Sequence, residues 1–201
     1  MTNNTIPTVQ ALLTKADVET YAADGAVCLR GVYDPQVVAQ LLRAWDRVSA
    51  DPVASGLIPP GAEHREIGDR ANIISRPSYA VGAFRDFIRA SPAPALLGAL
   101  LSAREIGFYW DTIFEKRPGS TFETSWHTDA GATAVLGNTM VNVWTPLTPV
   151  SRESSLEILA GSHTNDVLYW PRSPNGVNLE RPPDRMWCPD YETARDDPTN
   201  R

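Results

Sequence analysis

The sequence contains few of the features that mark secreted, membrane-bound or nucleic-acid-binding proteins. Only two cysteines occur in 201 residues, which argues against a disulfide framework and makes reduced thiols in the cytoplasm the expectation. No apolar run approaches the roughly 20 residues of a membrane span, and no basic segment followed by an apolar one marks a secretory signal. The net charge of −6 gives no reason to expect binding to nucleic acid or to an anionic membrane.

Histidine is also scarce, and this limits the metal sites that the chain can form. The three histidines are His64, His127 and His163. His64 lies in a loop-like stretch rich in proline, glycine and charge, where a surface or substrate-loop role is expected. A cupin, which needs a histidine cluster, is therefore disfavoured, and a zinc hydrolase would need a better third ligand than the chain offers.

The composition is that of a globular domain with short elements. Hydrophobic residues make up 42% of the chain, and 201 residues suffice for one domain with a core. The 17 prolines and 13 glycines favour short elements and long loops. We expect a single domain over residues 1–201, in which the aromatic-rich residues 164–201 form an irregular flap or tail.

Capping signals predict helices in the first half of the chain. Thr14 is typical of an N-cap, and the helix it begins should end before Gly25. Asp34 and Pro35 predict the start of the next helix, which has the three-to-four spacing of a buried face. A helical pattern in two pieces follows over residues 81–101.

The second half of the chain has the pattern of β-structure. Apolar, aromatic and β-branched runs predict strands over residues 26–30, 106–116, 121–129, 139–147 and 155–159. The fold class expected is therefore α+β, mainly β, with flanking helices in the N-terminal half.

The stretch Ser125-Trp126-His127-Thr128-Asp129 carries the strongest chemical signal. Side chains at positions i and i+2 of a strand share one face, so His127 and Asp129 could bind one metal ion together. Two histidines and one carboxylate on one face are the ligand set of non-haem Fe(II) oxygenases. Alone, such a pair is more often a surface salt bridge than a metal site.

Three segments together give the chain a resemblance to a known family. They are DGAVCLRGVYDPQVVAQLLRAWDRV, IFEKRPGSTFETSWHTD and VNVWTPLTPVSRESSLEILAGSH, in this order. Over about residues 20–165 the sequence resembles the phytanoyl-CoA dioxygenase family of Fe(II)- and 2-oxoglutarate-dependent oxygenases. The resemblance implies a double-stranded β-helix (jelly roll) flanked by helices.

The resemblance also implies roles for individual residues. His127 and Asp129 match the first two iron ligands, Lys116 matches a residue that holds the 2-oxoglutarate carboxylate, and Trp144 matches a residue that lines the cosubstrate pocket. Lys116 as a surface lysine and Trp144 as a core residue are the competing interpretations. A carboxylate at position 129 favours hydroxylation or another oxidation over halogenation, because related halogenases carry a small residue there. Possible substrate contacts, with core packing or flap anchoring as the alternative, are Trp110, Asp111 and Trp170.

The family's distal histidine and the arginine that follows it have no counterpart after His163. Three explanations are open: the last strands of the jelly roll are missing from a truncated chain, the protein is an inactive homologue, or His163 serves as the third ligand. His163 falls on the family's Gly-Ser-His, which is a structural turn in relatives, and a ligand needs rigid support. An incomplete jelly roll would leave open strand edges through which the chain could form oligomers.

The expected function is therefore that of an Fe(II)- and 2-oxoglutarate-dependent dioxygenase acting on a small organic molecule. The alternative is a catalytically inactive, truncated homologue that serves as a binding or structural protein. The expected partners are a small-molecule substrate, Fe(II) and 2-oxoglutarate, without nucleic acid or membrane.

Overall fold

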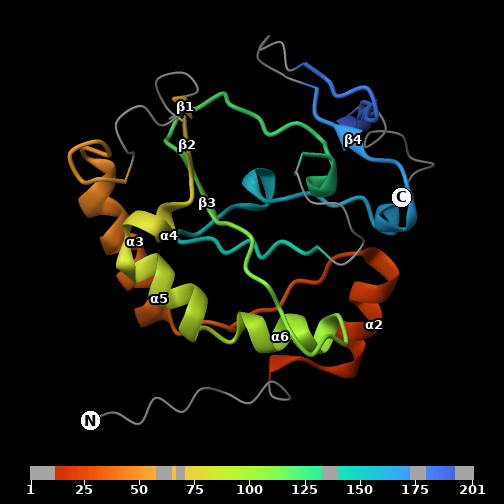
Figure 1. Cartoon of the computed structure of the whole chain (residues 1–201), viewed down its shortest axis with the longest axis horizontal. Helices are drawn as coiled ribbons and strands as arrows, with labels where there is room; N and C mark the ends of the chain where they lie inside the picture. The colour runs from red at the N-terminus through yellow and green to blue at the C-terminus, as the bar shows by residue number, and fades with distance from the viewer. Residues whose placement is uncertain (1–11, 58–64, 67–70, 133–139, 173–179, 193–201) are drawn as a thin grey trace. The chain divides into compact units, whose positions relative to one another are not determined.

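The computed structural model describes residues 12–57, 65–66, 71–132, 140–172 and 180–192 (Figure 1). The chain divides into two compact units. The first unit comprises residues 1–66, 72–115 and 143–164, and the second comprises residues 67–71, 116–142 and 165–201. None of the helices in the described ranges is both long enough and apolar enough to cross a membrane.

The first unit begins with helix α2 (Lys15–Asp24), as the sequence predicts. The Thr14 hydroxyl accepts a hydrogen bond from the Asp17 N–H at 3.2 Å, and the Asp17 carboxylate accepts one from the Thr14 N–H at 2.8 Å. This reciprocal capping box satisfies two N–H groups that a helix start would otherwise leave without partners. Gly25 ends the helix with a φ of 79°, a left-handed conformation that favours glycine.

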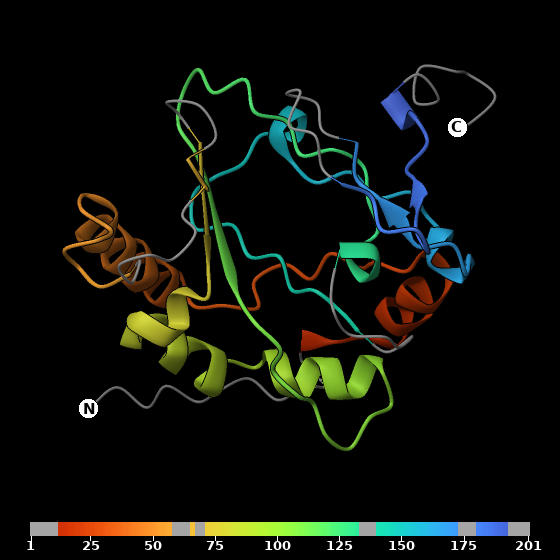
Figure 2. The same cartoon turned by 45° about the horizontal axis from the view of Figure 1, so that its top comes forward.

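Helix α3 (Pro35–Ser49) is the main packing element of the first unit. Asp34 caps its start by accepting a hydrogen bond from the Gln36 N–H at 2.7 Å, which confirms the predicted beginning. Three short helices follow later in the chain: α4 (Pro77–Ala80), α5 (Gly82–Ala90) and α6 (Ala93–Leu100). Figures 1 and 2 both show α3 and α5 side by side, and the two helices are in contact.

The core of the first unit lies between these helices and one strand, and its buried members are Leu41, Trp45, Leu57, Ile74 and Phe84. Trp45 also donates its indole N–H to Glu115 at 3.2 Å, so the polar edge of the ring has a partner. Burial of an aromatic ring with its N–H satisfied is a strongly stabilising arrangement.

The strands are short. In the larger sheet, β2 (Ala71–Ser75) lies between β1 (Arg65–Glu66) and β3 (Thr112–Lys116). In the second unit, β4 (Tyr169–Trp170) and β5 (Met186–Trp187) pair in parallel, with Tyr169 opposite Met186. Three 3₁₀ turns complete the regular structure, namely η1 (Asp129–Ala132), η2 (Arg152–Ser154) and η3 (Ser162–Thr164).

Several strand predictions are wrong in the described structure. Residues 26–30, 121–128 and 155–159 contain no strand, and neither do residues 140–147 of the fourth predicted segment. Only residues 112–116 of the segment 106–116 form one. The reason is physical: an apolar or alternating run fits a pleated surface, but a strand exists only where a neighbouring backbone supplies hydrogen bonds. The described chain is thus a mixed helix and sheet structure with few strands, compatible with a jelly roll without establishing one.

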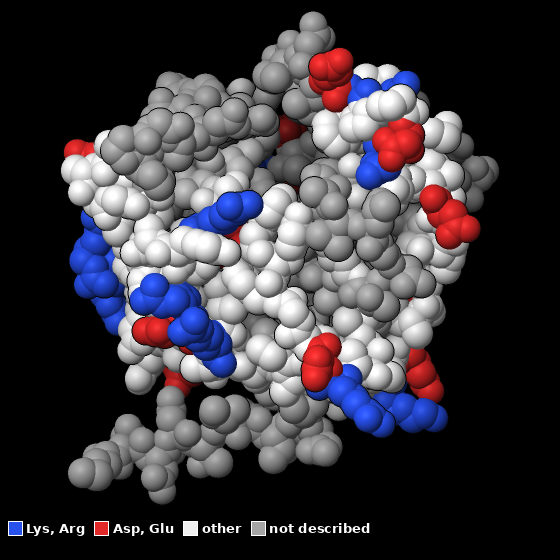
Figure 3. Space-filling model, viewed as in Figure 1, with Lys and Arg blue, Asp and Glu red and all other residues white. Residues whose placement is uncertain are grey.

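Charged side chains are interspersed on the face that Figure 3 shows. Acidic and basic groups alternate over short distances among the described residues of that face. Two predicted features lie partly or wholly outside the described residues. They are His64, and residues 173–179 and 193–201 of the predicted flap or tail.

Candidate metal centre

His127 and Asp129 lie in the second unit, just before and at the start of the 3₁₀ turn η1. The segment is not a strand, yet the two side chains converge. The His127 Nε2 atom lies 3.2 Å from Asp129 Oδ1, with the His127 side chain 29% exposed and that of Asp129 54% exposed. The two side chains are therefore in contact, although the strand on which the prediction was based is absent. Their role as metal ligands stays a prediction.

The backbone fixes which nitrogen of His127 faces the carboxylate. His127 Nδ1 lies 2.7 Å from the Ser125 carbonyl oxygen. A carbonyl can only accept a hydrogen bond, so Nδ1 must carry a proton, and Nε2 presents its lone pair or a second proton to Asp129. Metal-binding histidines are commonly oriented in this way, with the second ring nitrogen donating to a backbone carbonyl.

The same contact shifts the pKa values of both groups. The hydrogen bond to Asp129 raises the pKa of His127 against the opposing effect of desolvation. The hydrogen bond to His127 is also the largest cause that lowers the pKa of Asp129. The two side chains therefore share a hydrogen bond, and a divalent cation would compete with its proton, because metal ligands must be deprotonated.

The spacing fits two adjacent positions around one metal ion. Ligand atoms at about 2.1 Å from an ion, in neighbouring octahedral positions, lie about 3 Å apart. The 3.2 Å between Nε2 and Oδ1 agrees with this value. Within the described ranges, no group of three or more His, Cys, Asp or Glu could hold a metal ion.

The other residues of the motif anchor it to the C-terminal part of the second unit. The Thr128 hydroxyl accepts a hydrogen bond from the Tyr169 N–H at 3.0 Å, and the Thr128 N–H donates to the Tyr169 carbonyl at 3.3 Å. The Ser125 hydroxyl donates to the Arg172 carbonyl. These contacts fix the backbone on both sides of His127.

Trp126 adds a contact with the end of the described chain. Its indole N–H donates to Glu192 at 2.8 Å, and its ring meets that of Tyr191 edge to face at 5.5 Å. The motif therefore contacts residues 169–172 and 191–192, which belong to the segment 164–201 that the sequence predicts to be an irregular flap or tail. Sequence reasoning missed these anchors, because the segment carries no periodic pattern.

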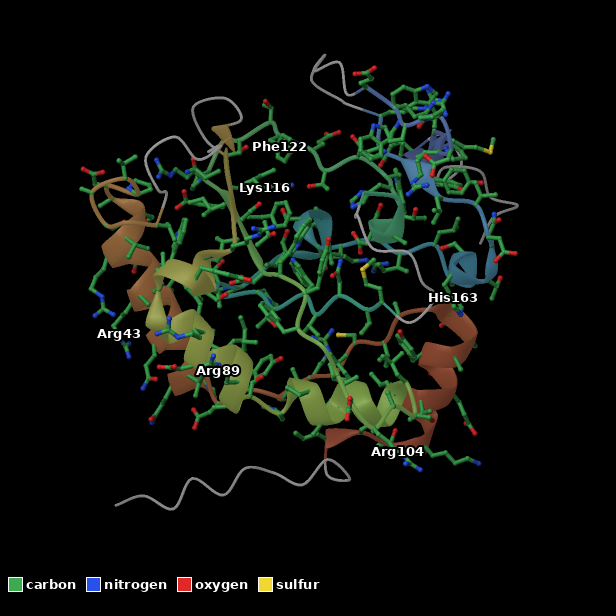
Figure 4. The ribbon with its side chains drawn as sticks, in the orientation of Figure 1. Arg43, Arg89, Arg104, Lys116, Phe122 and His163 are labelled. Atoms are coloured by element: carbon green, nitrogen blue, oxygen red, sulfur yellow. The ribbon has the colours of Figure 1, made fainter. Side chains whose placement is uncertain are left out.

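Two further predicted site residues lie in the second unit. Lys116 lies 5.2 Å from the centre of the Phe122 ring, and its ammonium group donates to Thr124 at 3.3 Å (Figure 4). Desolvation lowers the pKa of Lys116, and the nearby charge of Glu123 opposes this shift. Trp170 has a buried indole N–H for which the described residues provide no acceptor.

The remaining predicted residues lie in the first unit. Trp144 is 46% exposed in an extended segment. Trp110 stacks on Tyr109 with the ring centres 4.7 Å apart, and the Arg76 guanidinium lies 5.9 Å from the Trp110 ring centre. Asp111 accepts hydrogen bonds from the Ser78 N–H and hydroxyl at 2.9 and 2.8 Å, so it stabilises the start of α4.

His163 contacts the end of helix α2 within the first unit (Figure 4). Its Nε2 atom lies 3.2 Å from the Ala22 carbonyl oxygen. Its ring lies directly against Gly25, where an added Cβ would come within 2.5 Å of His163 Nδ1. The Gly161 N–H also donates to the Asp24 carbonyl at 2.9 Å. These contacts favour the structural-turn interpretation of Gly161-Ser162-His163 over a role for His163 as a metal ligand.

Comparison with known proteins gives one match. The family model described as phytanoyl-CoA dioxygenase (PhyH) matches residues 21–190. No curated protein and no solved structure matches the chain. The matched region contains the His127–Asp129 pair and two of its anchors, Tyr169 and Arg172.

Proposed function

Because the chain belongs to the phytanoyl-CoA dioxygenase family, we propose that it is an Fe(II)- and 2-oxoglutarate-dependent dioxygenase that hydroxylates or otherwise oxidises a small organic substrate. The family suggests oxygenase chemistry with iron and 2-oxoglutarate. The proposal includes the double-stranded β-helix that the family implies.

One observation carries the proposal: the His127 imidazole is oriented by the backbone and lies against the Asp129 carboxylate. Their ligand atoms are 3.2 Å apart, and the Ser125 carbonyl at 2.7 Å from Nδ1 keeps the Nε2 atom directed at the carboxylate. A neutral imidazole and a carboxylate are two of the three ligands of the facial triad found in non-haem iron oxygenases. The motif anchors keep this geometry in place without a strand.

In the proposed enzyme, His127 and Asp129 hold the metal, and Lys116 and Trp144 contact 2-oxoglutarate. When bound, iron and 2-oxoglutarate supply the oxidation of a substrate C–H bond, coupled to decarboxylation of the cosubstrate. The Lys116 ammonium suits a carboxylate as a partner, and its lowered pKa reflects a partly desolvated position next to Phe122. A carboxylate at position 129 occupies the position that a halide would need, which favours hydroxylation.

Substrate contacts are proposed for Trp110, Asp111 and Trp170. The indole N–H of Trp170 is the best supported, because a buried donor without an acceptor among the described residues is costly and a bound ligand would satisfy it. Asp111 has both carboxylate oxygens engaged by Ser78, so a substrate would have to compete with that contact.

An anaerobic titration tests the proposal. Fe(II) and 2-oxoglutarate are added to the 201-residue chain, and the visible charge-transfer band of the chelated complex is recorded. We expect a band with the wild-type chain and none with His127→Ala, followed by succinate release once O2 and a substrate are supplied.

The outcome separates the two candidate functions. Absence of the band from a folded wild-type chain would contradict the enzyme proposal and favour the alternative of a catalytically inactive homologue with a binding or structural role. A band of equal strength in His127→Ala would place the metal elsewhere and overturn the assignment of the site.

A further inference from the structure

One buried arginine, Arg185, contacts the turn that follows the metal-binding motif, and the proposed function assigns it no role. Arg185 belongs to the second unit and precedes strand β5, and only 9% of its surface is exposed. Arginine is rarely buried to this extent unless it is paired and hydrogen-bonded, because desolvation of its charge is costly. The partners of this side chain therefore identify what the buried charge holds in place.

The principal partner is the backbone of the turn that carries Asp129. Arg185 Nε donates a hydrogen bond to the Gly131 carbonyl oxygen at 3.1 Å. The Gly131 N–H donates to the Thr128 carbonyl at 2.9 Å, which closes the turn around Asp129. Arg185 thus binds the far end of a turn whose near end is the metal-binding motif.

Gly131 packs so closely against strand β4 that no side chain would fit at this position. A Cβ atom at this position would lie 2.4 Å from the Tyr169 carbonyl oxygen and 2.8 Å from the Thr128 hydroxyl. The turn is therefore fixed on two sides, by β4 on one and by the Arg185 guanidinium on the other. Ligands held in this way by surrounding hydrogen bonds bind metal more tightly than unsupported ones.

From this geometry we infer that Arg185 is a positioning residue of the metal site, which sets the affinity for the metal by holding the Gly131 carbonyl and with it the turn that carries Asp129. The inference rests on the proposed metal site at His127 and Asp129. It assigns to residues 180–192 a direct part in that site rather than the role of a loose flap.

The shape of the arginine side chain explains why this position needs it. While Nε donates to Gly131, Nη1 pairs with the Asp184 carboxylate, so one rigid group binds in two directions. A lysine ammonium lacks this planar fork and cannot reproduce both contacts with the same geometry. The Arg185 carbonyl also accepts a hydrogen bond from Arg181, which adds a further backbone contact to the segment.

The chain provides a matched control in Arg172. Its Nε also donates to a backbone carbonyl, that of Cys188 at 2.7 Å, and its guanidinium lies 5.8 Å from the centre of the Trp187 ring. Arg172 belongs to the same unit and makes the same kind of hydrogen bond. The acceptor of its side chain lies outside the turn that carries Asp129. Among the described residues, Arg172 contacts the motif only through its backbone carbonyl, which accepts from the Ser125 hydroxyl, and a lysine at this position keeps that carbonyl.

The test measures Co(II) binding to the full chain as wild type, Arg185→Lys, Arg172→Lys and His127→Ala. Co(II) affinity is obtained by competition with a chromophoric chelator, its ligand-field spectrum is recorded, and unfolding is followed in the metal-free state. We expect Arg185→Lys to weaken Co(II) binding about tenfold and to alter the spectrum, in line with other residues that support metal ligands. Arg172→Lys should leave affinity and spectrum unchanged even if it destabilises the fold to a similar extent.

The outcomes distinguish the role of Arg185 from the existence of the metal site. Unchanged Co(II) affinity and spectrum in a folded Arg185→Lys variant, with binding lost in His127→Ala, would overturn the role of Arg185 and leave the proposed function intact. An equal loss of affinity in Arg172→Lys would also overturn it, because general destabilisation would then be the cause. Unchanged binding in His127→Ala, or no binding by the wild type, would overturn the metal site and the inference with it.

A milder variant keeps the inference testable if Arg185→Lys does not fold. The Asp184 side chain is 65% exposed, so Asp184→Asn should fold while it removes one partner of the guanidinium. We expect a loss of Co(II) affinity of about twofold, as suits an exposed ion pair. No loss with this variant, when Arg185→Lys is unfolded, would contradict the inference.

Discussion

The two units of the molecule are stabilised in different ways. The first unit buries large apolar side chains, among them Leu41, Trp45 and Phe84, against one another. Among the described residues of the second unit, the buried side chains are small or polar: Ala71, Arg185 and Cys188. The second unit instead relies on hydrogen bonds between side chains and backbone carbonyls, many of which surround residues 125–129.

This difference indicates a division of labour between stability and chemistry. Apolar burial is non-directional and contributes most of the free energy of folding. Hydrogen bonds contribute less but fix direction, which a metal site requires. We therefore expect substitutions in the first unit to change mainly the free energy of unfolding, and substitutions around the motif to change mainly metal affinity.

The largest effect should come from the core of the first unit. Trp45→Ala removes a buried ring and leaves a cavity, so the free energy of unfolding should fall by about 3–5 kcal/mol. It would also leave the Glu115 carboxylate without its indole partner. Urea titration followed by circular dichroism measures the change. A loss below about 1 kcal/mol would contradict the assignment of Trp45 to the core.

The two cysteines provide a probe in each unit. Cys28 in the first unit is exposed, and Cys188 in the second is buried. A thiol reagent should modify Cys28 on the order of 100-fold faster, because Cys188 reacts only after local opening. Mass spectrometry of single-cysteine variants, Cys28→Ser and Cys188→Ser, measures the two rates separately.

The pH dependence of the slower reaction has a defined sign. Burial raises the pKa of Cys188, against a smaller opposing effect of the Arg172 charge. Because the thiolate is the reactive form, modification of Cys188 should keep accelerating above the pH at which an ordinary thiol is fully ionised. Equal rates for the two cysteines would show that the second unit does not protect its interior.

His163→Ala separates structural from metal-binding histidines. It removes the contact with the Ala22 carbonyl and the packing on Gly25, so the free energy of unfolding should fall by about 1–2 kcal/mol. Co(II) affinity should stay at the wild-type value, in contrast to His127→Ala. A loss of Co(II) affinity in His163→Ala, measured by the same chelator competition, would instead support His163 as the third metal ligand.

The smallest effect should come from the exposed cap of α2. Thr14→Ala deletes the hydroxyl of the capping box and should reduce stability by about 1 kcal/mol, while Thr14→Ser should restore most of it. The hydrogen bonds from Thr14 lower the pKa of Asp17, so the stability that the cap contributes depends on pH. The cap's stabilisation is present above the ordinary pKa of an aspartate and is lost as pH falls through the lowered value. An identical acid unfolding profile in Thr14→Ala and wild type would exclude this contribution.

The sequence predicts the local features of the molecule and misses the long-range ones. The starts of α2 and α3 follow from Thr14, Asp34 and Pro35, because capping depends on residues only a few positions apart. The strand predictions over residues 121–129 and 155–159 are wrong, because a strand requires a distant partner that periodicity does not identify.

The candidate site divides in the same way. His127 and Asp129 are two residues apart, so their meeting could be predicted, and the geometry agrees. Arg185 could not be predicted, because its acceptor is a backbone carbonyl 54 residues away, and every residue type carries one. Lys116, Trp144, Trp110, Asp111 and Trp170 stay predictions for cosubstrate and substrate binding.

Gly131 has a consequence for how this protein can vary. Any side chain at this position would clash with the Tyr169 carbonyl oxygen. Even alanine could therefore be accommodated only if β4 were displaced. A saturation library at codon 131 screened for metal retention should therefore return glycine alone. Exposed positions of α2 such as Lys15 should accept most residues in the same screen. Such a map of tolerated residues would define the extent of the proposed metal site by genetics, without any structure of the bound state.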